Sequence, residues 1–177
     1  VGDGTSDSDP EQFVIWNDEV YFIAEVATGL QLWKTDGTAD GTVMVAEPNV
    51  GGDGDMDYLK LYNDKLYFAA TDGTNGVELW SYDGTTASMV KDLDGDVTSG
   101  DPQELTEVDG LLFFEGKLNG DVVLWVSNGT TDYTMPVSEA LNTTSYPVKV
   151  NLAEKAIVDS SGSVTKKYWT LRKGSLG

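Results

Sequence analysis

Short runs of hydrophobic residues, separated by turn residues, follow one another along most of the chain. In the part from 55 to 100, four such runs are rich in Tyr, Phe, Val, Leu and Trp, which favour strands. They are Tyr58–Tyr62, Lys65–Ala70, Val77–Tyr82 and Ala87–Leu93. The Asn, Asp and Gly residues between the runs tolerate the left-handed backbone of tight turns. Helical periodicity is nowhere sustained, and Ser138–Leu141 would form one turn at most. The pattern therefore predicts an all-β protein.

Three landmarks recur at a nearly constant spacing and indicate an internal repeat. A Leu-Trp pair occurs three times and has a weaker fourth copy: Leu32-Trp33, Leu79-Trp80, Leu124-Trp125 and Tyr168-Trp169. A strand core recurs every 46 residues: Val20–Phe22, Leu66–Phe68 and Leu112–Phe114. An aspartate recurs at the same spacing: Asp9, Asp55 and Asp101. Four strands repeated at about 45 residues are typical of propeller blades. We therefore expect a β-propeller-like array of four four-stranded blades, the fourth divergent.

The repeat also sets the expected domain boundaries. We expect an N-terminal arm over 1–8 and a single repeat domain over 9–177, with blades at about 9–54, 55–100, 101–145 and 146–177. The Asp-Gly-Thr turn is missing after Trp169, and only eight residues follow, too few for a turn and an outer strand. Two alternatives follow: a four-bladed ring with an incomplete seam, or a segment that neighbouring sheets of the same or another chain complete.

The recurring motif has a structural interpretation. A Trp at one place in every unit is expected to fill the gap between neighbouring blades. The Asp-Gly-Thr that follows it is expected to be a turn, in which the Asp side chain accepts backbone amides.

Charge and composition exclude several classes of protein. The chain has 177 residues, with 30 acidic and 11 basic side chains, a net charge of −19, and neither Cys nor His. Disulfides, thiol nucleophiles and imidazole bases are therefore excluded, and a duplex nucleic-acid binder is not expected. No apolar run approaches the length of a membrane span. Residues 149–177 carry 6 basic and 2 acidic side chains, which predicts either packing against the acidic body or a docking face.

Alternating aspartates in two inter-blade loops are candidate calcium ligands. They are Asp53, Asp55 and Asp57 in one loop and Asp92, Asp94 and Asp96 in the next. Carboxylates two residues apart in a loop can converge on Ca²⁺, which takes six to eight oxygens. The EF-hand pattern does not fit, because Tyr58 and Val97 stand where it needs Gly. The alternative is an acidic loop that keeps the chain soluble.

Four aromatic residues near strand ends are candidate ligand-binding residues: Trp16, Tyr58, Tyr62 and Tyr82. Flat rings beside acidic and amide side chains often hold sugars through stacking and hydrogen bonds. The alternative is that these are ordinary half-buried strand aromatics.

The repeat resembles the ELWxxDGT repeat of bacterial secreted and surface proteins. The best match is Glu78-Leu79-Trp80-Ser81-Tyr82-Asp83-Gly84-Thr85, and Gln31–Thr42 keeps the trailing Gly-Thr of that family. The resemblance is good over residues 9–137 and fades beyond 138. It implies an exported, propeller-like protein, secreted or at the cell surface, and it brings no catalytic residues.

These observations favour an extracellular binding or adhesion module of a bacterial surface protein. Its expected ligand is a glycan or peptide, and its binding is expected to depend on calcium. The alternative is a structural subunit of a surface layer, sheath or filament that binds copies of itself through blade edges. Catalysis is not expected, because the aspartates stand mostly in Gly-rich turns, whereas a glycosidase needs two carboxylates in a cleft.

Overall fold

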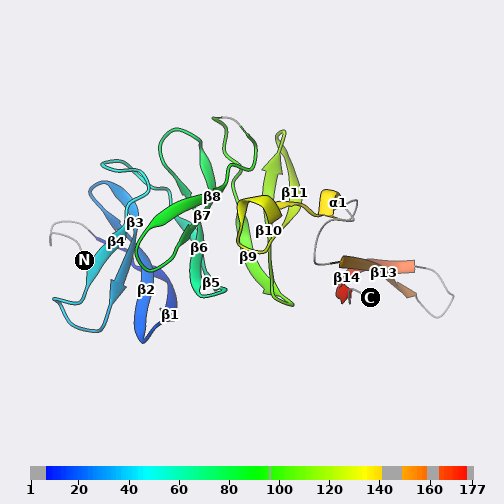
Figure 1. Cartoon of the computed structure of the whole chain (residues 1–177), viewed down its shortest axis with the longest axis horizontal. Coiled ribbons are helices and arrows are strands. Elements are labelled where there is room, and N and C mark those ends of the chain that lie inside the picture. The colour runs from blue at the N-terminus through cyan, green and yellow to red at the C-terminus, as the bar shows by residue number, and fades with distance from the viewer. Residues whose placement is uncertain (1–6, 96, 141–148, 159–163, 175–177) are drawn as a thin grey trace. The chain divides into compact units, whose positions relative to one another are not determined.

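The computed structural model describes residues 7–95, 97–140, 149–158 and 164–174 (Figure 1). The chain divides into two compact units, Val1–Met135 and Pro136–Gly177. The expected repeat domain over 9–177 spans both units.

The first unit is built from three four-stranded antiparallel sheets that follow one another along the chain (Figure 1). Sheet 1 contains β1 (Glu11–Trp16), β2 (Glu19–Val26), β3 (Gly29–Thr35) and β4 (Val43–Ala46). Sheet 2 contains β5 (Asp57–Tyr62), β6 (Lys65–Thr71), β7 (Val77–Tyr82) and β8 (Ala87–Lys91). Sheet 3 contains β9 (Gln103–Val108), β10 (Leu111–Leu118), β11 (Asp121–Ser127) and β12 (Met135–Pro136). The all-β prediction is confirmed, and every strand of sheet 2 agrees with its predicted bounds within two residues.

Equivalent positions of the sequence repeat have the same backbone conformation in the three sheets. Gln12, Tyr58 and Glu104, each 46 residues apart, have φ angles of 55°, 57° and 55°. Each lies where the pairing of the first two strands of its sheet shifts register, so the three sheets share one bulge. The hairpin turns Asn17-Asp18 and Asn63-Asp64 also have positive φ at both residues, as the turn composition predicts.

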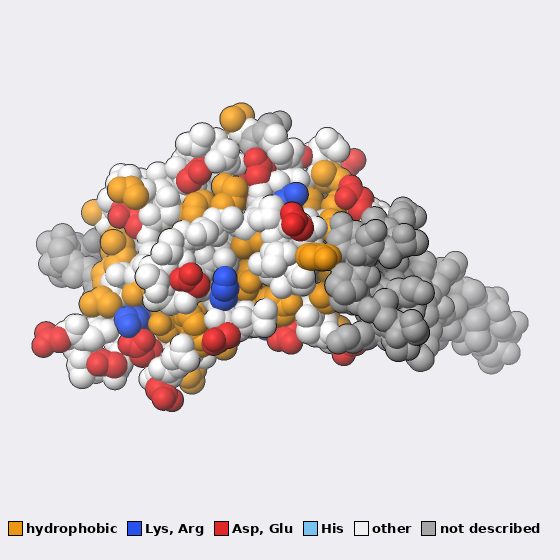
Figure 2. Space-filling model, in the orientation of Figure 1, with side chains coloured by type: hydrophobic (Ala, Val, Ile, Leu, Met, Phe, Trp, Pro, Cys, Tyr) orange, Lys and Arg blue, Asp and Glu red, His pale blue; other side chains and the backbone are white. Residues whose placement is uncertain are grey.

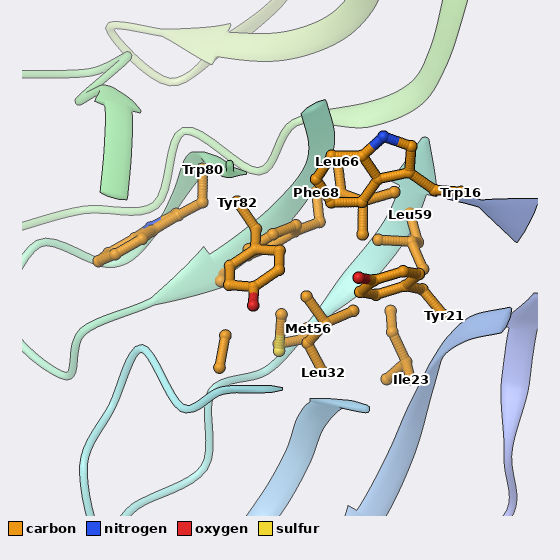
Figure 3. Packing of buried hydrophobic residues seen from close by; sticks show 12 residues of the cluster. Trp16, Tyr21, Ile23, Leu32, Met56, Leu59, Leu66, Phe68, Trp80 and Tyr82 are labelled. Carbon is orange, nitrogen blue, oxygen red and sulfur yellow. The ribbon is translucent and has the colours of Figure 1, made fainter. Parts of the chain in front are cut away.

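Adjacent sheets pack face to face through two apolar clusters. Cluster 1 joins sheets 1 and 2, and its buried residues are Trp16, Tyr21, Ile23, Leu32, Ala46, Met56, Leu59, Leu66, Phe68, Ala70, Trp80 and Tyr82 (Figure 3). Cluster 2 joins sheets 2 and 3, and its buried residues are Tyr62, Tyr67, Leu79, Val90, Leu93, Leu105, Leu112, Phe114 and Trp125. The core of the first unit therefore lies between the sheets.

The Leu-Trp pair divides its two side chains between these clusters. Leu32 and Trp80 belong to cluster 1, whereas Leu79 and Trp125 belong to cluster 2. Successive residues of a strand point to opposite faces of its sheet. Each Leu therefore faces the following sheet, and Trp80 and Trp125 face the preceding one. The prediction that the repeated Trp fills the gap between blades is confirmed for these two residues.

Among its described residues, the second unit contains one helical turn, α1 (Val137–Ala140), and an antiparallel hairpin of β13 (Lys149–Val158) and β14 (Val164–Gly174). A 3₁₀ turn, η1 (Thr131–Tyr133), precedes β12 in the first unit. The hairpin supplies two strands where the sequence predicts the fourth blade, and a closed four-bladed ring stays a prediction. Among the described residues, no helix has the length and apolar character to cross a membrane.

Candidate functional site

A polar hollow lies where the turns of sheets 2 and 3 meet. We call it the turn hollow; it has a volume of about 350 Å³ and is lined by Tyr62, Asn63, Glu107, Gly110 and Asn128. Tyr62 ends β5, and Asn63 and Gly110 stand in the first hairpin turns of their sheets. Asn128 follows β11 directly. The lining thus combines one carboxylate, two amides and the end of a phenol ring.

The Tyr62 side chain, which lines the turn hollow, joins sheets 2 and 3. Its hydroxyl donates to the carbonyl oxygen of Gly110 at 2.9 Å, and its ring centroid lies 5.5 Å from that of Tyr67. Burial, and then the charge of Glu107, raise the pKa of Tyr62. The phenol therefore stays neutral at physiological pH and holds its donor bond to Gly110.

The same contact occurs between sheets 1 and 2, with a different ring. Trp16 Nε1–H donates to Asp64 Oδ1 at 2.8 Å. Trp16 and Tyr62 are 46 residues apart, as are their acceptors Asp64 and Gly110. The 46-residue repeat could therefore have located the turn hollow from the sequence. It implies that the end of the first strand of each sheet, at Trp16 or Tyr62, contacts the first hairpin turn of the next sheet. Three lining residues of the turn hollow were not predicted as site residues from the sequence: Asn63, Glu107 and Asn128.

The four predicted ligand-binding aromatics lie mainly in the core. Trp16, Tyr62 and Tyr82 expose 6%, 5% and 4% of their surface. Trp16 and Tyr82 meet edge to face in cluster 1, with centroids 6.3 Å apart (Figure 3). Tyr58 is half-buried and packs against cluster 2. Of the four, Tyr62 lines the turn hollow. Stacking of a sugar on these rings stays a prediction, and the burial of three of them favours a structural role.

In the first acidic loop, carboxylates fix the loop backbone. Asp53 Oδ1 accepts the amides of Leu30 at 3.0 Å and Asp55 at 2.9 Å. The Asp57 carboxylate accepts a hydrogen bond from the backbone amide of Tyr58 at 2.7 Å and another from the side-chain amide of Gln12. Burial, followed by the charge of Asp53, raises the pKa of Asp55. These contacts tie the loop to sheet 1.

In the second acidic loop, Asp92 Oδ1 accepts the amide of Gly95 at 2.7 Å. Asp94 accepts the Thr98 hydroxyl at 2.7 Å and the Asn119 amide at 2.5 Å, and it lines a second polar hollow of about 430 Å³ with Lys117. Asp96 lies outside the described residues. Within the described part of the chain, no three carboxylates gather as a metal site would require. Calcium binding by the six aspartates stays a prediction.

Glu78, beside the second Leu-Trp pair, has a structural role that was not predicted from the sequence. Its side chain is fully buried, and its two oxygens accept the amides of Leu93 and Gly100, each at 2.7 Å. Burial raises the pKa of Glu78 to about 7, although the two amide bonds oppose the shift. The equivalent residue of sheet 1, Gln31, is also fully buried and donates to the Gly52 carbonyl at 3.1 Å. This position therefore anchors the loop that leads to the next sheet.

The turn after each Leu-Trp pair has the predicted geometry. Asp36 accepts the amide of Thr38 at 2.9 Å, Asp83 that of Thr85 at 2.9 Å, and Asn128 that of Thr130 at 3.0 Å. Hydrogen bonds from the Thr38 hydroxyl and amide lower the pKa of Asp36, and backbone amides lower that of Asp83. These side chains serve the turn, as predicted.

Comparison with known proteins gives no match, either to a protein-family model or to a curated protein sequence.

Proposed function

We propose that this chain is an extracellular recognition module of a bacterial surface protein and that it binds a glycan in the turn hollow. The hollow carries the proposal: its volume of about 350 Å³ lies within the range of small-molecule sites, and its lining is mostly polar. The resemblance of the repeat to exported ELWxxDGT proteins supports a location outside the cell.

The lining residues are matched to a ligand rich in hydroxyl groups. The Glu107 carboxylate accepts hydrogen bonds from hydroxyls, whereas the Asn63 and Asn128 amides both donate and accept. Asn128 Oδ1 already accepts the Thr130 amide and hydroxyl, at 3.0 and 2.8 Å, so its amide group is held in place. Tyr62 is fixed by its bond to Gly110 and forms an apolar wall.

A glycan array, probed with the full chain with and without calcium, tests this proposal. Asn63→Gly removes an amide from the turn hollow, yet Gly suits the positive φ of 48° at this position. Asn17→Gly makes the same change at the equivalent turn of sheet 1 and is the matched control. We expect Asn63→Gly and Glu107→Gln to weaken binding about tenfold, as the loss of one hydrogen bond predicts, and Asn17→Gly to leave it unchanged.

Absence of glycan binding in both conditions would contradict the proposal, as would equal binding by wild type and both turn-hollow variants. Binding of peptides alone would replace the glycan by a peptide ligand.

We propose as a second function that the chain is a structural subunit of a propeller-like array that further sheets complete. The supporting observation is that sheets 1 and 3 expose large apolar side chains on the faces that point away from sheet 2.

A further inference from the structure

The two outer sheet faces of the first unit carry five of its exposed large apolar side chains. Figure 2 shows apolar side chains reaching the surface among acidic ones over the strands of sheet 1. On the outer face of sheet 1, Phe13, Ile15 and Met44 are 61%, 74% and 41% exposed. On the outer face of sheet 3, Val122 and Leu124 are 63% and 43% exposed.

The outer face of sheet 1 is the counterpart of a face that is covered in sheet 2. Phe13 and Ile15 stand 46 residues before Leu59 and Leu61. Leu59 is 8% exposed in cluster 1, and Leu61 packs against that cluster. The outer face of sheet 1 also bears Trp33, the counterpart of Trp80. We call this surface the Trp face; its residues are Phe13, Ile15 and Met44, which are exposed, Trp33, which is half-buried, and Phe22, which is buried and stacks on Phe13.

The outer face of sheet 3 corresponds to the faces of sheets 1 and 2 that pack against the following sheet. Leu124 corresponds to Leu79, which is fully buried in cluster 2, and to Leu32, which is fully buried in cluster 1. Strand register places Val126 opposite Phe113 and Leu124 opposite Glu115, so these residues share one side of the sheet. We call this surface the Leu face; its residues are Val122 and Leu124, which are exposed, and Phe113 and Val126, which are buried.

We propose that the Leu face of one copy of this chain binds the Trp face of a second copy, head to tail. The same kind of contact already occurs twice within the chain, from sheet 1 to sheet 2 and from sheet 2 to sheet 3, so the new contact continues an existing interface. Such a heterologous contact forms a ring if the rotation closes. Two copies with three sheets each would give six blades, within the range of propellers. This inference rests on the second proposed function.

Charge opposes this association and gives it a salt dependence. Each copy carries a net charge of −19, so two copies repel each other at low ionic strength. Apart from Glu115, which pairs with Leu124, the residues that define the two faces are apolar, and burial of apolar side chains is not weakened by screening. We therefore expect the dissociation constant to fall as salt rises, opposite to the behaviour of an interface held by ion pairs.

Sedimentation velocity of the full chain, over a roughly hundredfold range of concentration and at low and high salt, tests the proposal. Wild type is expected to form a dimer or a larger ring. Ile15→Glu damages the Trp face alone and Leu124→Glu the Leu face alone, and each is expected to weaken association at least tenfold. Because each variant keeps one intact face, an equimolar mixture of the two is expected to form a dimer again.

Val50→Glu and Val97→Glu are matched controls. Both residues are exposed apolar side chains, at 85% and 76%, but they lie in the loops between sheets. We expect both variants to associate like wild type. Circular dichroism is expected to show that all four variants fold, since each changed side chain is exposed.

A wild type that stays monomeric would overturn the head-to-tail contact, and so would failure of the mixed variants to form a dimer. An apolar dye separates this failure from that of the array function. If wild type is a monomer that binds the dye, and Ile15→Glu abolishes dye binding, the Trp face is open to a sheet of another protein. The array function then survives. A monomer without dye binding overturns both proposals, and glycan binding by the turn hollow is independent of either outcome.

Discussion

The buried carboxylate of Glu78 accepts the backbone amide of Leu93 at 2.7 Å, across the loop that leaves sheet 2. Its second oxygen accepts the amide of Gly100, at the other end of the same loop. A motif residue beside the repeated Trp thereby fixes the path of the chain from one sheet to the next. Burying a carboxylate has an electrostatic cost, which the raised pKa of about 7 records.

This burial predicts a pH dependence of stability. Folding raises the pKa of Glu78 from 4.5 to about 7, so the folded state binds this proton more tightly than the unfolded state does. The stabilising contribution is therefore complete below pH 4.5 and is lost as pH rises through 7, by about 3 kcal/mol in all. Glu78→Gln, which copies the Gln31 of sheet 1, is expected to lack this fall.

Urea unfolding of wild type and Glu78→Gln from pH 5 to pH 8 measures the difference, because other carboxylates contribute equally to both proteins. A constant difference over this range would contradict the prediction. In wild type, the amide NMR signals of Leu93 and Gly100 are expected to titrate with a midpoint near 7.

The contact between Trp16 and Asp64 predicts a matched pair of turn variants. Asp64→Gly removes the acceptor of the indole N–H while keeping a residue that tolerates the φ of 57°. An indole N–H that loses its partner in a 6% exposed side chain is expected to cost about 1–3 kcal/mol of unfolding free energy. Asp18→Gly alters the equivalent turn of sheet 1, φ 63°, and serves as the control. Similar unfolding free energies for the two variants would show that the Trp16 bond contributes nothing.

Two glycines with the same backbone angle separate strain from close packing. Gly37 and Gly129 both have φ of 92°, but a Cβ at Gly129 would lie 2.3 Å from Tyr67 Oη, whereas none of the described atoms lies within 4 Å of one at Gly37. Gly37→Ala is expected to cost about 1–2 kcal/mol from the backbone alone. Gly129→Ala is expected to cost about 1–3 kcal/mol more.

Tyr67→Phe removes the hydroxyl that the new methyl group would meet. In this background the difference between the two alanine variants, measured by urea unfolding, is expected to shrink. If it persists, the close contact between Gly129 and Tyr67 is not its source.

The period of the chain made its strands and turns predictable, because each turn is specified by local residues such as Asn63 and Asp83. The face of a sheet that a side chain occupies also follows from alternation, so the role of Trp80 between sheets could be foreseen. Local sequence does not show which of these faces is covered, because the covering residues belong to a neighbouring sheet about 46 residues away. Tyr82 and Trp16 therefore seemed available to a ligand, although they are buried against each other.

The roles of the aspartates in the acidic loops could not be predicted from local sequence either. Asp53 and Asp94 have the spacing of metal ligands, but their carboxylates bond to the amides of Leu30 and Asn119, 23 and 25 residues away in the sequence. Those amides are placed by hairpins that the local pattern around the aspartates does not reveal. Glu78 was missed for the related reason that its partners stand 15 and 22 residues further on.

The central claim is that the Leu79-Trp80 pair divides its two side chains between the two sheet interfaces. Double-mutant cycles test it directly, with Leu32→Val combined either with Trp80→Phe or with Leu79→Val. Leu32 and Trp80 share cluster 1, so their effects on unfolding free energy are expected to couple by about 0.5 kcal/mol or more. Leu79 is adjacent to Trp80 in the chain but belongs to cluster 2, so its effect is expected to add to that of Leu32. Additive effects for Leu32 and Trp80, or equal coupling in both cycles, would contradict this division.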